Sequence, residues 1–234
     1  MTTNIKKIVN YVKNQNDKLS NRKIGLLSLF FKDPFIEDID VELVFERINQ
    51  LLPDHILELI DVIYVGEFQY FKDRDINAMY SDGAIYVDNK QEDESDLIDD
   101  VIHEFAHVIE NSYGDLIYTD GLIKQNFLSK RMKLKSFLKY ENHDIGDYDF
   151  TEIKYDENLD MFLKDGIGYK KLNNLTQGLF LGAYSTVSLR EYFARGFEEY
   201  YLGDHVYLKR VCPYIYNKLS LLDSLTDKEA NYEL

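Results

Sequence analysis

The spacing of apolar residues predicts that most of the chain is helical. Apolar side chains recur every three or four positions in four stretches, residues 3–19, 40–52, 95–112 and 186–202. Pro53 directly follows the second stretch and is expected to end that helix, because proline cannot continue the hydrogen-bond pattern of a helix. These four segments are the predicted helical frame.

Between the second and third predicted helices the pattern changes to short runs of β-branched and aromatic residues. Residues 62–65 (Val-Ile-Tyr-Val) precede Gly66, which predicts a short buried strand. Residues 78–80 and 84–88 flank the turn sequence Ser-Asp-Gly, which predicts a β-hairpin. The fold class is therefore α+β, mostly helical, with a small mixed or antiparallel sheet before the third helix.

The strand predicted at residues 84–88 leads directly into the helix at 95–112. If that strand has a free edge, it can pair with an extended peptide, and we expect it to align a substrate. The alternative is an interior strand, and the sequence leaves both open. Gly114 follows the last periodic residue of the helix, where a left-handed stop is expected.

No repeat or linker rich in proline, glycine or serine divides the chain, so we predict one domain over residues 1–234. Its predicted parts are a helical and sheet region at about 1–92, a helix at 95–112, a helical insertion at about 116–180, a helix at 186–202 and a C-terminal helix at about 205–224.

Charge and composition limit the binding partners and the cellular location that we expect for this protein. The net charge of −15 argues against nucleic acid or an anionic membrane surface as a partner, because both would be repelled. Cys212 is the single cysteine, so no internal disulfide forms, and we predict a small core residue. Residues 1–7 lack the continuous apolar region expected of a secretion signal, and the longest apolar run, residues 24–31, is shorter than the roughly 20 residues that span a bilayer. We expect an intracellular, cytoplasmic protein and leave open a viral origin or export by an unrecognised route.

The basic cluster at 130–135 is interpreted as a solvated helix face.

The third helix carries the sequence His-Glu-x-x-His at residues 103–107. Residues four apart on a helix lie about 40° apart, so the imidazoles of His103 and His107 can reach one ion. Zinc binds neutral imidazole well, and Glu104 stands where a general base is needed. The alternative is a helix with a solvated histidine pair.

A hydrolytic zinc site takes three protein ligands and leaves one position for water, so a third ligand is required. The helix at 186–202 offers two carboxylates on nearly one face, Glu191 and Glu198. Ser188 and Glu191 also fit a capping box, in which the glutamate would bind a backbone N–H instead of a metal. Spacing alone leaves these alternatives open.

The chain resembles the anthrax lethal factor-like zinc metallopeptidases, a gluzincin family that includes secreted Pro-Pro endopeptidases. The resemblance covers about residues 78–202 and rests on the His-Glu-x-x-His motif, on Glu191-Tyr192-Phe193-Ala194 and on Tyr184, seven residues before Glu191. It implies a zincin-like fold and one Zn²⁺ held by His103, His107 and Glu191. It also implies that Glu104 is the general base and that Tyr184 stabilises the tetrahedral intermediate. Tyr184 could instead be an ordinary packed aromatic residue.

Two features depart from the family pattern. The span from His107 to Glu191 is longer than is typical, so residues 116–180 are interpreted as an insertion that shapes or covers the cleft. Arg195 stands where gluzincins usually place an acidic residue that orients a histidine ligand. Another carboxylate or carbonyl must therefore hold that imidazole if the site is active.

These observations predict a zinc-dependent endopeptidase in which Glu104 activates a zinc-bound water against a peptide or protein substrate. The main alternative is a catalytically inactive, protease-like binding or scaffold protein, which Arg195 favours. A deformylase-like hydrolase is a third alternative, but it would need a cysteine ligand, and Cys212 lies outside any metal motif.

Overall fold

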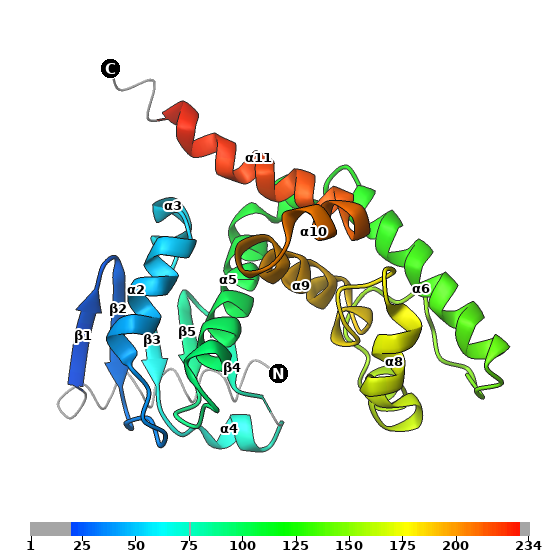
Figure 1. Ribbon diagram of the computed structural model, residues 1–234, viewed down its shortest axis with the longest axis horizontal. Coiled ribbons are helices and arrows are strands. Elements are labelled where there is room, and N and C mark those ends of the chain that lie inside the picture. Colours follow the sequence, from blue (N-terminus) through cyan, green and yellow to red (C-terminus); the bar gives the residue numbers. More distant parts are fainter. Residues whose placement is uncertain (1–19, 75, 230–234) are drawn as a thin grey trace. The chain divides into compact units, whose positions relative to one another are not determined.

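The computed structural model of the chain describes residues 20–74 and 76–229 (Figure 1). The chain divides into two compact units between Ser112 and Tyr113. Our expectation of a single domain over residues 1–234 stays a prediction. The helix predicted at residues 3–19 lies outside the described residues.

The first unit contains a mixed sheet of five strands, in the order β1-β2-β3-β5-β4. The strands are β1 (Ser20–Ile24), β2 (Leu27–Phe31), β3 (Val62–Val65), β4 (Ala78–Ser81) and β5 (Ala84–Val87). The pairs β1–β2 and β4–β5 are antiparallel, whereas β2–β3 and β3–β5 are parallel. The predicted strand at 62–65 and the hairpin after it are confirmed, and the first hairpin, β1–β2, was not predicted.

The position of β5 corrects one expectation. β5 pairs with β3 on one side and with β4 on the other, so it is an interior strand and has no free edge for a peptide. The edge strand is β4, because no strand in the described part of the chain pairs with its outer side. β4 pairs with the side of β5 that β3 leaves open, because the tight turn at Asp82 and Gly83, both with positive φ, joins the two strands as a hairpin.

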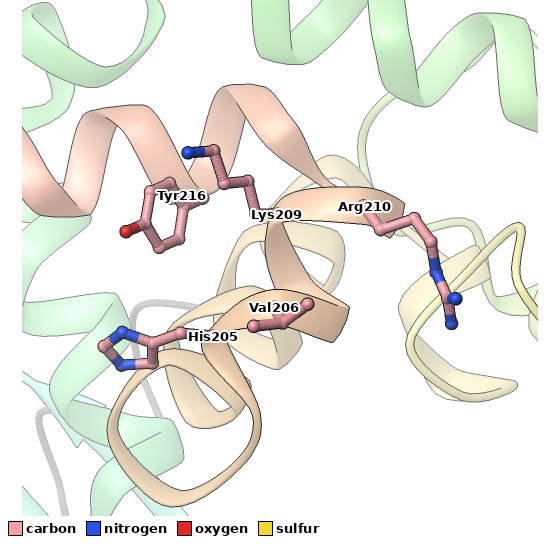
Figure 2. A pocket seen from close by; sticks show the side chains of 5 residues that line it. All are labelled: His205, Val206, Lys209, Arg210 and Tyr216. Carbon is pink, nitrogen blue, oxygen red and sulfur yellow. The ribbon is translucent and has the colours of Figure 1, made fainter.

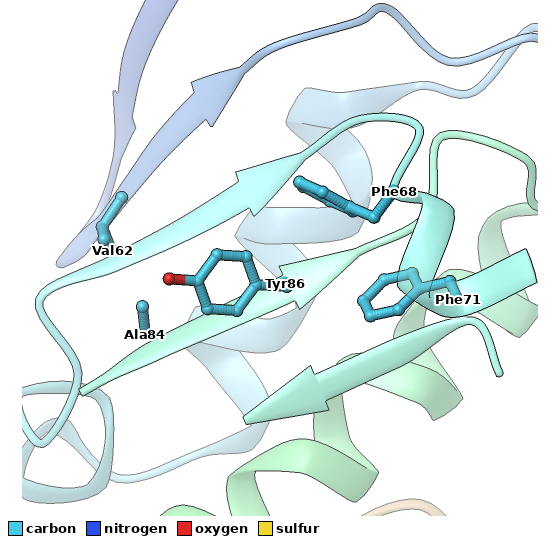
Figure 3. Close-up of a cluster of buried hydrophobic side chains, with 5 residues drawn as sticks. All are labelled: Val62, Phe68, Phe71, Ala84 and Tyr86. Carbon is cyan, nitrogen blue, oxygen red and sulfur yellow. The ribbon is translucent and has the colours of Figure 1, made fainter. Parts of the chain in front are cut away.

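Among the described residues of the first unit, the helices are α2 (Val41–Leu51), α3 (Asp54–Leu57), α4 (Gln69–Lys72) and the beginning of α5 (Glu94–Tyr118). The side chain of Asp40 accepts a hydrogen bond from the N–H of Leu43 at 3.0 Å and caps α2, which ends before Pro53 as predicted. α2 and the first part of α5 lie on one face of the sheet, and α4 lies on the other (Figures 1 and 3).

The face of the sheet beside α4 is aromatic. Tyr86 of β5 is buried among Val62, Ala84, Phe68 and Phe71 (Figure 3). The ring of Tyr86 makes an edge contact with that of Phe68, with ring centres 5.8 Å apart. Both faces of the central strands are therefore covered by apolar side chains, which agrees with the continuous apolar runs in their sequences.

α5 does not end as expected. The backbone leaves helical geometry at Tyr113 (φ −122°, ψ 21°) and then continues as helix to Tyr118. Gly114 is not among the glycines with positive φ, so the expected left-handed stop at Gly114 is wrong. The predicted helix at 95–112 agrees with the part of α5 that precedes the break at Tyr113.

The second unit is helical. After the end of α5 it contains α6 (Leu122–Tyr140), α7 (Glu157–Met161), the π-helix η1 (Phe162–Gly168), α8 (Tyr169–Thr176), the 3-10 helix η2 (Tyr184–Thr186), α9 (Leu189–Leu202), α10 (His205–Val211) and α11 (Pro213–Glu229). α9 contacts α6, α10 and α11. The close approach of α9 to α11 depends on Gly196, where an added Cβ would lie 2.7 Å from Ile215 Cγ2.

Two predictions for the second unit are wrong. The single C-terminal helix expected at about 205–224 is two helices, α10 and α11, because Pro213 cannot continue α10. The solvated face expected at 130–135 is wrong for two of its cations, because Lys130 is 6% exposed and Arg131 is fully buried, whereas Lys133 is exposed. Buried acceptors explain the burial, because backbone carbonyls receive hydrogen bonds from both cations. None of the described helices is long and apolar enough to cross a membrane.

Candidate metal centre

The His-Glu-x-x-His motif lies in the middle of the first part of α5. Apolar residues of the same helix are fully buried and fix its orientation on the sheet: Leu97, Val101, Phe105, Val108 and Ile109. The rings of His103 and His107 lie one turn apart, with centres 5.1 Å apart and planes at 85°. The predicted helical placement of both histidines is therefore confirmed.

Glu104 is 7% exposed, and its carboxylate is held by the edge strand. Its Oε2 accepts a hydrogen bond from the backbone N–H of Tyr80 at 2.5 Å. Tyr80 is opposite Ile85 in β5, next to the pair Ser81–Ala84 that flanks the two-residue turn. Antiparallel pairs alternate, so the polar backbone groups of Tyr80 point outward from the sheet and can reach Glu104.

A carboxylate that sequence reasoning missed holds one of the histidines. Glu110 Oε2 lies 2.8 Å from His107 Nδ1, and the two side chains are only 7% and 9% exposed. A carboxylate at Nδ1 is the partner that commonly orients the ring of a metal-binding histidine. The pair could have been found from sequence, because residues three apart on a helix are neighbours. Glu110 therefore gives His107 a carboxylate partner from the same helix.

Asp100 lies one turn before His103 and is close enough for their charges to interact. Burial raises the pKa of Asp100 to about 7, and repulsion from Asp96 adds to the rise. The carboxyl group therefore carries a proton near neutral pH more readily than an exposed aspartate does. A cation bound nearby would favour the charged form and lower the pKa.

Glu191 lies in the first turn of α9. The side chain of Ser188 accepts a hydrogen bond from the N–H of Glu191 at 3.1 Å, so Ser188 caps the start of this helix. The apolar side of α9 is buried, as predicted: Leu189, Phe193, Phe197 and Tyr200.

Among the described residues, His103, His107 and Glu191 form a group that could hold a metal ion. One ligand atom from each residue lies within 4.8 Å of the others. Two imidazoles and one carboxylate are a donor set that suits zinc.

The competing carboxylate is engaged elsewhere. Glu198 forms an ion pair with Arg195, and its side chain is 7% exposed. Tyr184 lies in η2 and is 37% exposed, with its ring centre 6.4 Å from that of Tyr169. The catalytic role expected for Tyr184 stays a prediction.

Two surface clefts contain none of these residues. One, of about 400 Å³, is lined by residues of α10 and α11: His205, Val206, Lys209, Arg210 and Tyr216 (Figure 2). The other, of about 430 Å³, lies in the first unit beside β1 and α2. Cys212 is buried and lies outside both clefts, as expected of a core residue.

In the comparisons with known proteins, no protein-family model, no curated protein and no solved structure matches the chain.

Proposed function

We propose that the chain is a zinc-dependent endopeptidase with a zincin-like fold. The observation that carries this proposal is the group of His103, His107 and Glu191, whose ligand atoms lie within 4.8 Å of one another. The buried Glu104 follows the first of these ligands in the order that hydrolytic zinc sites use. A bound zinc ion would polarise a peptide carbonyl and acidify a water molecule.

The chain's own residues supply the proton transfers. Glu104 takes the proton from the attacking water and passes it to the departing amine. Its buried position beside the motif histidines suits this role, and its hydrogen bond from Tyr80 fixes the carboxylate. Tyr184 donates its phenolic hydrogen to the oxygen that becomes negative when water attacks the carbonyl.

The substrate main chain pairs with β4. The carbonyl of Tyr80 and the backbone groups of Ala78 lie at pairing positions that alternate with the hydrogen-bonded pairs of the hairpin, so they point away from β5. An extended peptide added at this edge would continue the sheet. This proposal replaces β5 with β4 as the strand that aligns the substrate.

Glu110 weakens the main alternative, an inactive scaffold protein. That alternative rested on Arg195, which cannot orient a histidine ligand as an acid does. Glu110 provides this contact to His107 from the motif helix itself.

The test compares the purified protein with Glu104→Gln on a mixed peptide library, with the zinc content of both measured. We expect the parent to cleave peptides, and we expect the variant to bind equal zinc without cleaving. Equal cleavage by both proteins would show that Glu104 is not the base. A zinc-loaded parent that cleaves nothing would instead favour the binding or scaffold protein.

A further inference from the structure

α6 carries two adjacent buried cations, and removing charged groups from water costs free energy. Lys130 is 6% exposed and Arg131 is fully buried. Burial lowers the pKa of both groups. Lysine and arginine are rarely buried, and replacing buried charges by apolar residues of similar volume is often neutral or stabilising. Stability alone therefore does not explain the pair, and the contacts that the two side chains make are informative.

Lys130 is bound to the residue that follows Glu191. Its ammonium group donates to the hydroxyl oxygen of Tyr192 at 2.7 Å and to the carbonyl of Val211 at 2.7 Å. The ammonium also lies 4.8 Å from the centre of the Tyr192 ring. The Tyr192 hydroxyl in turn donates to Asn126 Oδ1 at 2.6 Å. Asn126 and Lys130, one turn apart on α6, thus hold the side chain of Tyr192 near the start of α9.

Arg131 is connected to the same turn through the backbone. Its Nη1 donates to the carbonyl of Glu152 at 2.6 Å, and within the described residues its Nε and Nη2 make no hydrogen bond. The next carbonyl along the chain, that of Ile153, accepts from the N–H of Leu189 at 2.8 Å. Leu189 is the first residue of α9. The Glu152–Ile153 segment therefore connects Arg131 to the start of the helix that carries Glu191.

We propose that Lys130 and Arg131 are positioning residues for Glu191, because together they fix the rotation and the start of α9. The proposal rests on the metal site of the proposed function. A carboxylate about 6 Å from a helix axis moves by about 1 Å when the helix rotates by 10°. Metal and catalytic sites tolerate displacements of roughly 0.5 Å. Even a slight rotation of α9 would therefore weaken binding of the ion by Glu191.

The test measures zinc affinity by competition with a chromophoric chelator in Lys130→Met, Tyr192→Phe and the parent. We expect Lys130→Met to weaken zinc binding about 10-fold to 100-fold, as is typical when a group that orients a metal ligand is lost. Tyr192→Phe removes one hydroxyl and keeps the ring, so it remains informative if the first variant does not fold. For it we expect a smaller loss, on the order of threefold to tenfold.

The matched control is Lys218→Met. Lys218 is also partly buried and donates to a backbone carbonyl, that of Leu116 at 2.8 Å, but it lies on α11 and pairs with Asp120. We expect this control to bind zinc as tightly as the parent.

The proposal is overturned if Lys130→Met binds zinc as tightly as the parent. If that variant does not fold, unchanged zinc affinity in Tyr192→Phe overturns it instead. An equal loss of zinc affinity in Lys218→Met would also overturn it. A parent that binds no zinc would overturn it as well. A parent that binds zinc but cleaves no peptide would overturn only the hydrolase, because the readout here is affinity.

Discussion

The imidazole of His107 and the carboxylate of Glu110 form a buried contact of 2.8 Å between Nδ1 and Oε2. Both residues lie on α5, three positions apart, so the helix itself sets their geometry. A carboxylate at Nδ1 fixes the ring and makes Nε2 a better metal ligand. The motif helix thus provides both a candidate ligand and the group that orients it.

This contact predicts how Glu110 affects metal affinity. Glu110→Ala removes the acceptor, and we expect zinc binding to weaken about 10-fold to 100-fold. Glu110→Gln keeps one acceptor oxygen, so we expect it to weaken zinc binding less than Glu110→Ala does. Competition titration with a chelator measures both, and Asp115→Asn, which removes an exposed carboxylate from the same helix, is the control. Equal affinity of all four proteins would mean that His107 needs no partner at Nδ1.

Glu191 and Glu198 should differ in their effect on zinc. In Glu191→Ala we expect metal content to fall well below one ion per chain, because one of three ligands is lost. In Glu198→Ala we expect zinc to be retained, although stability falls because Arg195 loses its ion-pair partner. Metal analysis after dialysis distinguishes the two variants. Loss of zinc in the Glu198 variant alone would reverse the assignment.

Local patterns predicted the elements that carry the candidate ligands. The helix at 95–112 and the helix of Glu191 both have clear apolar periodicity, and their starts were predicted within a few residues, whereas the end of the first helix was not. The β1–β2 hairpin was missed because polar residues such as Arg22 and Lys23 conceal its strand pattern. Its turn at Gly25, with φ +57°, is a two-residue connection that composition alone does not reveal.

Contacts distant in sequence could not be predicted. The burial of Lys130 depends on Tyr192 and on the carbonyl of Val211, and no local pattern indicates those partners. The interior position of β5 depends on its parallel pairing with β3, which the sequence left open. Glu110 differs from these cases, because helical spacing alone places it beside His107.

The raised pKa of Asp100 predicts a pH dependence of stability in the metal-free protein. Burial raises this pKa from 3.8 to about 7, so the folded state binds the proton more tightly than the unfolded state does. The resulting stabilisation is complete below pH 3.8 and is lost as the pH rises through about 7, by on the order of 4 kcal/mol at most.

Asp100→Asn removes this titration. Denaturant unfolding at pH 5 and pH 8 should therefore show a larger decrease in the free energy of unfolding for the parent than for the variant. Other groups titrate alike in both proteins, so the difference reports Asp100. Identical decreases would mean that Asp100 titrates as an exposed carboxyl group.

Two glycine substitutions should change stability in opposite directions. In Gly196→Ala the new methyl group would lie 2.7 Å and 2.8 Å from atoms of Ile215, so we expect a loss of about 1–3 kcal/mol in the free energy of unfolding. In Gly114→Ala no described atom beyond the adjoining helix backbone lies within 4 Å of the added methyl, so we expect the free energy of unfolding to rise by about 0.5–1 kcal/mol. Thermal and denaturant unfolding measure both. A neutral Gly196→Ala would mean that α9 and α11 can separate at little cost.

We propose that His103, His107 and Glu191 together hold one zinc ion. Zinc X-ray absorption spectroscopy on the protein loaded with one equivalent of zinc reports the ligands themselves. We expect a shell of nitrogen and oxygen atoms only, with the outer scattering of two imidazoles, and loss of that outer signal in the double variant His103→Ala/His107→Ala. A sulfur ligand at about 2.3 Å, or an unchanged spectrum in the double variant, would contradict it.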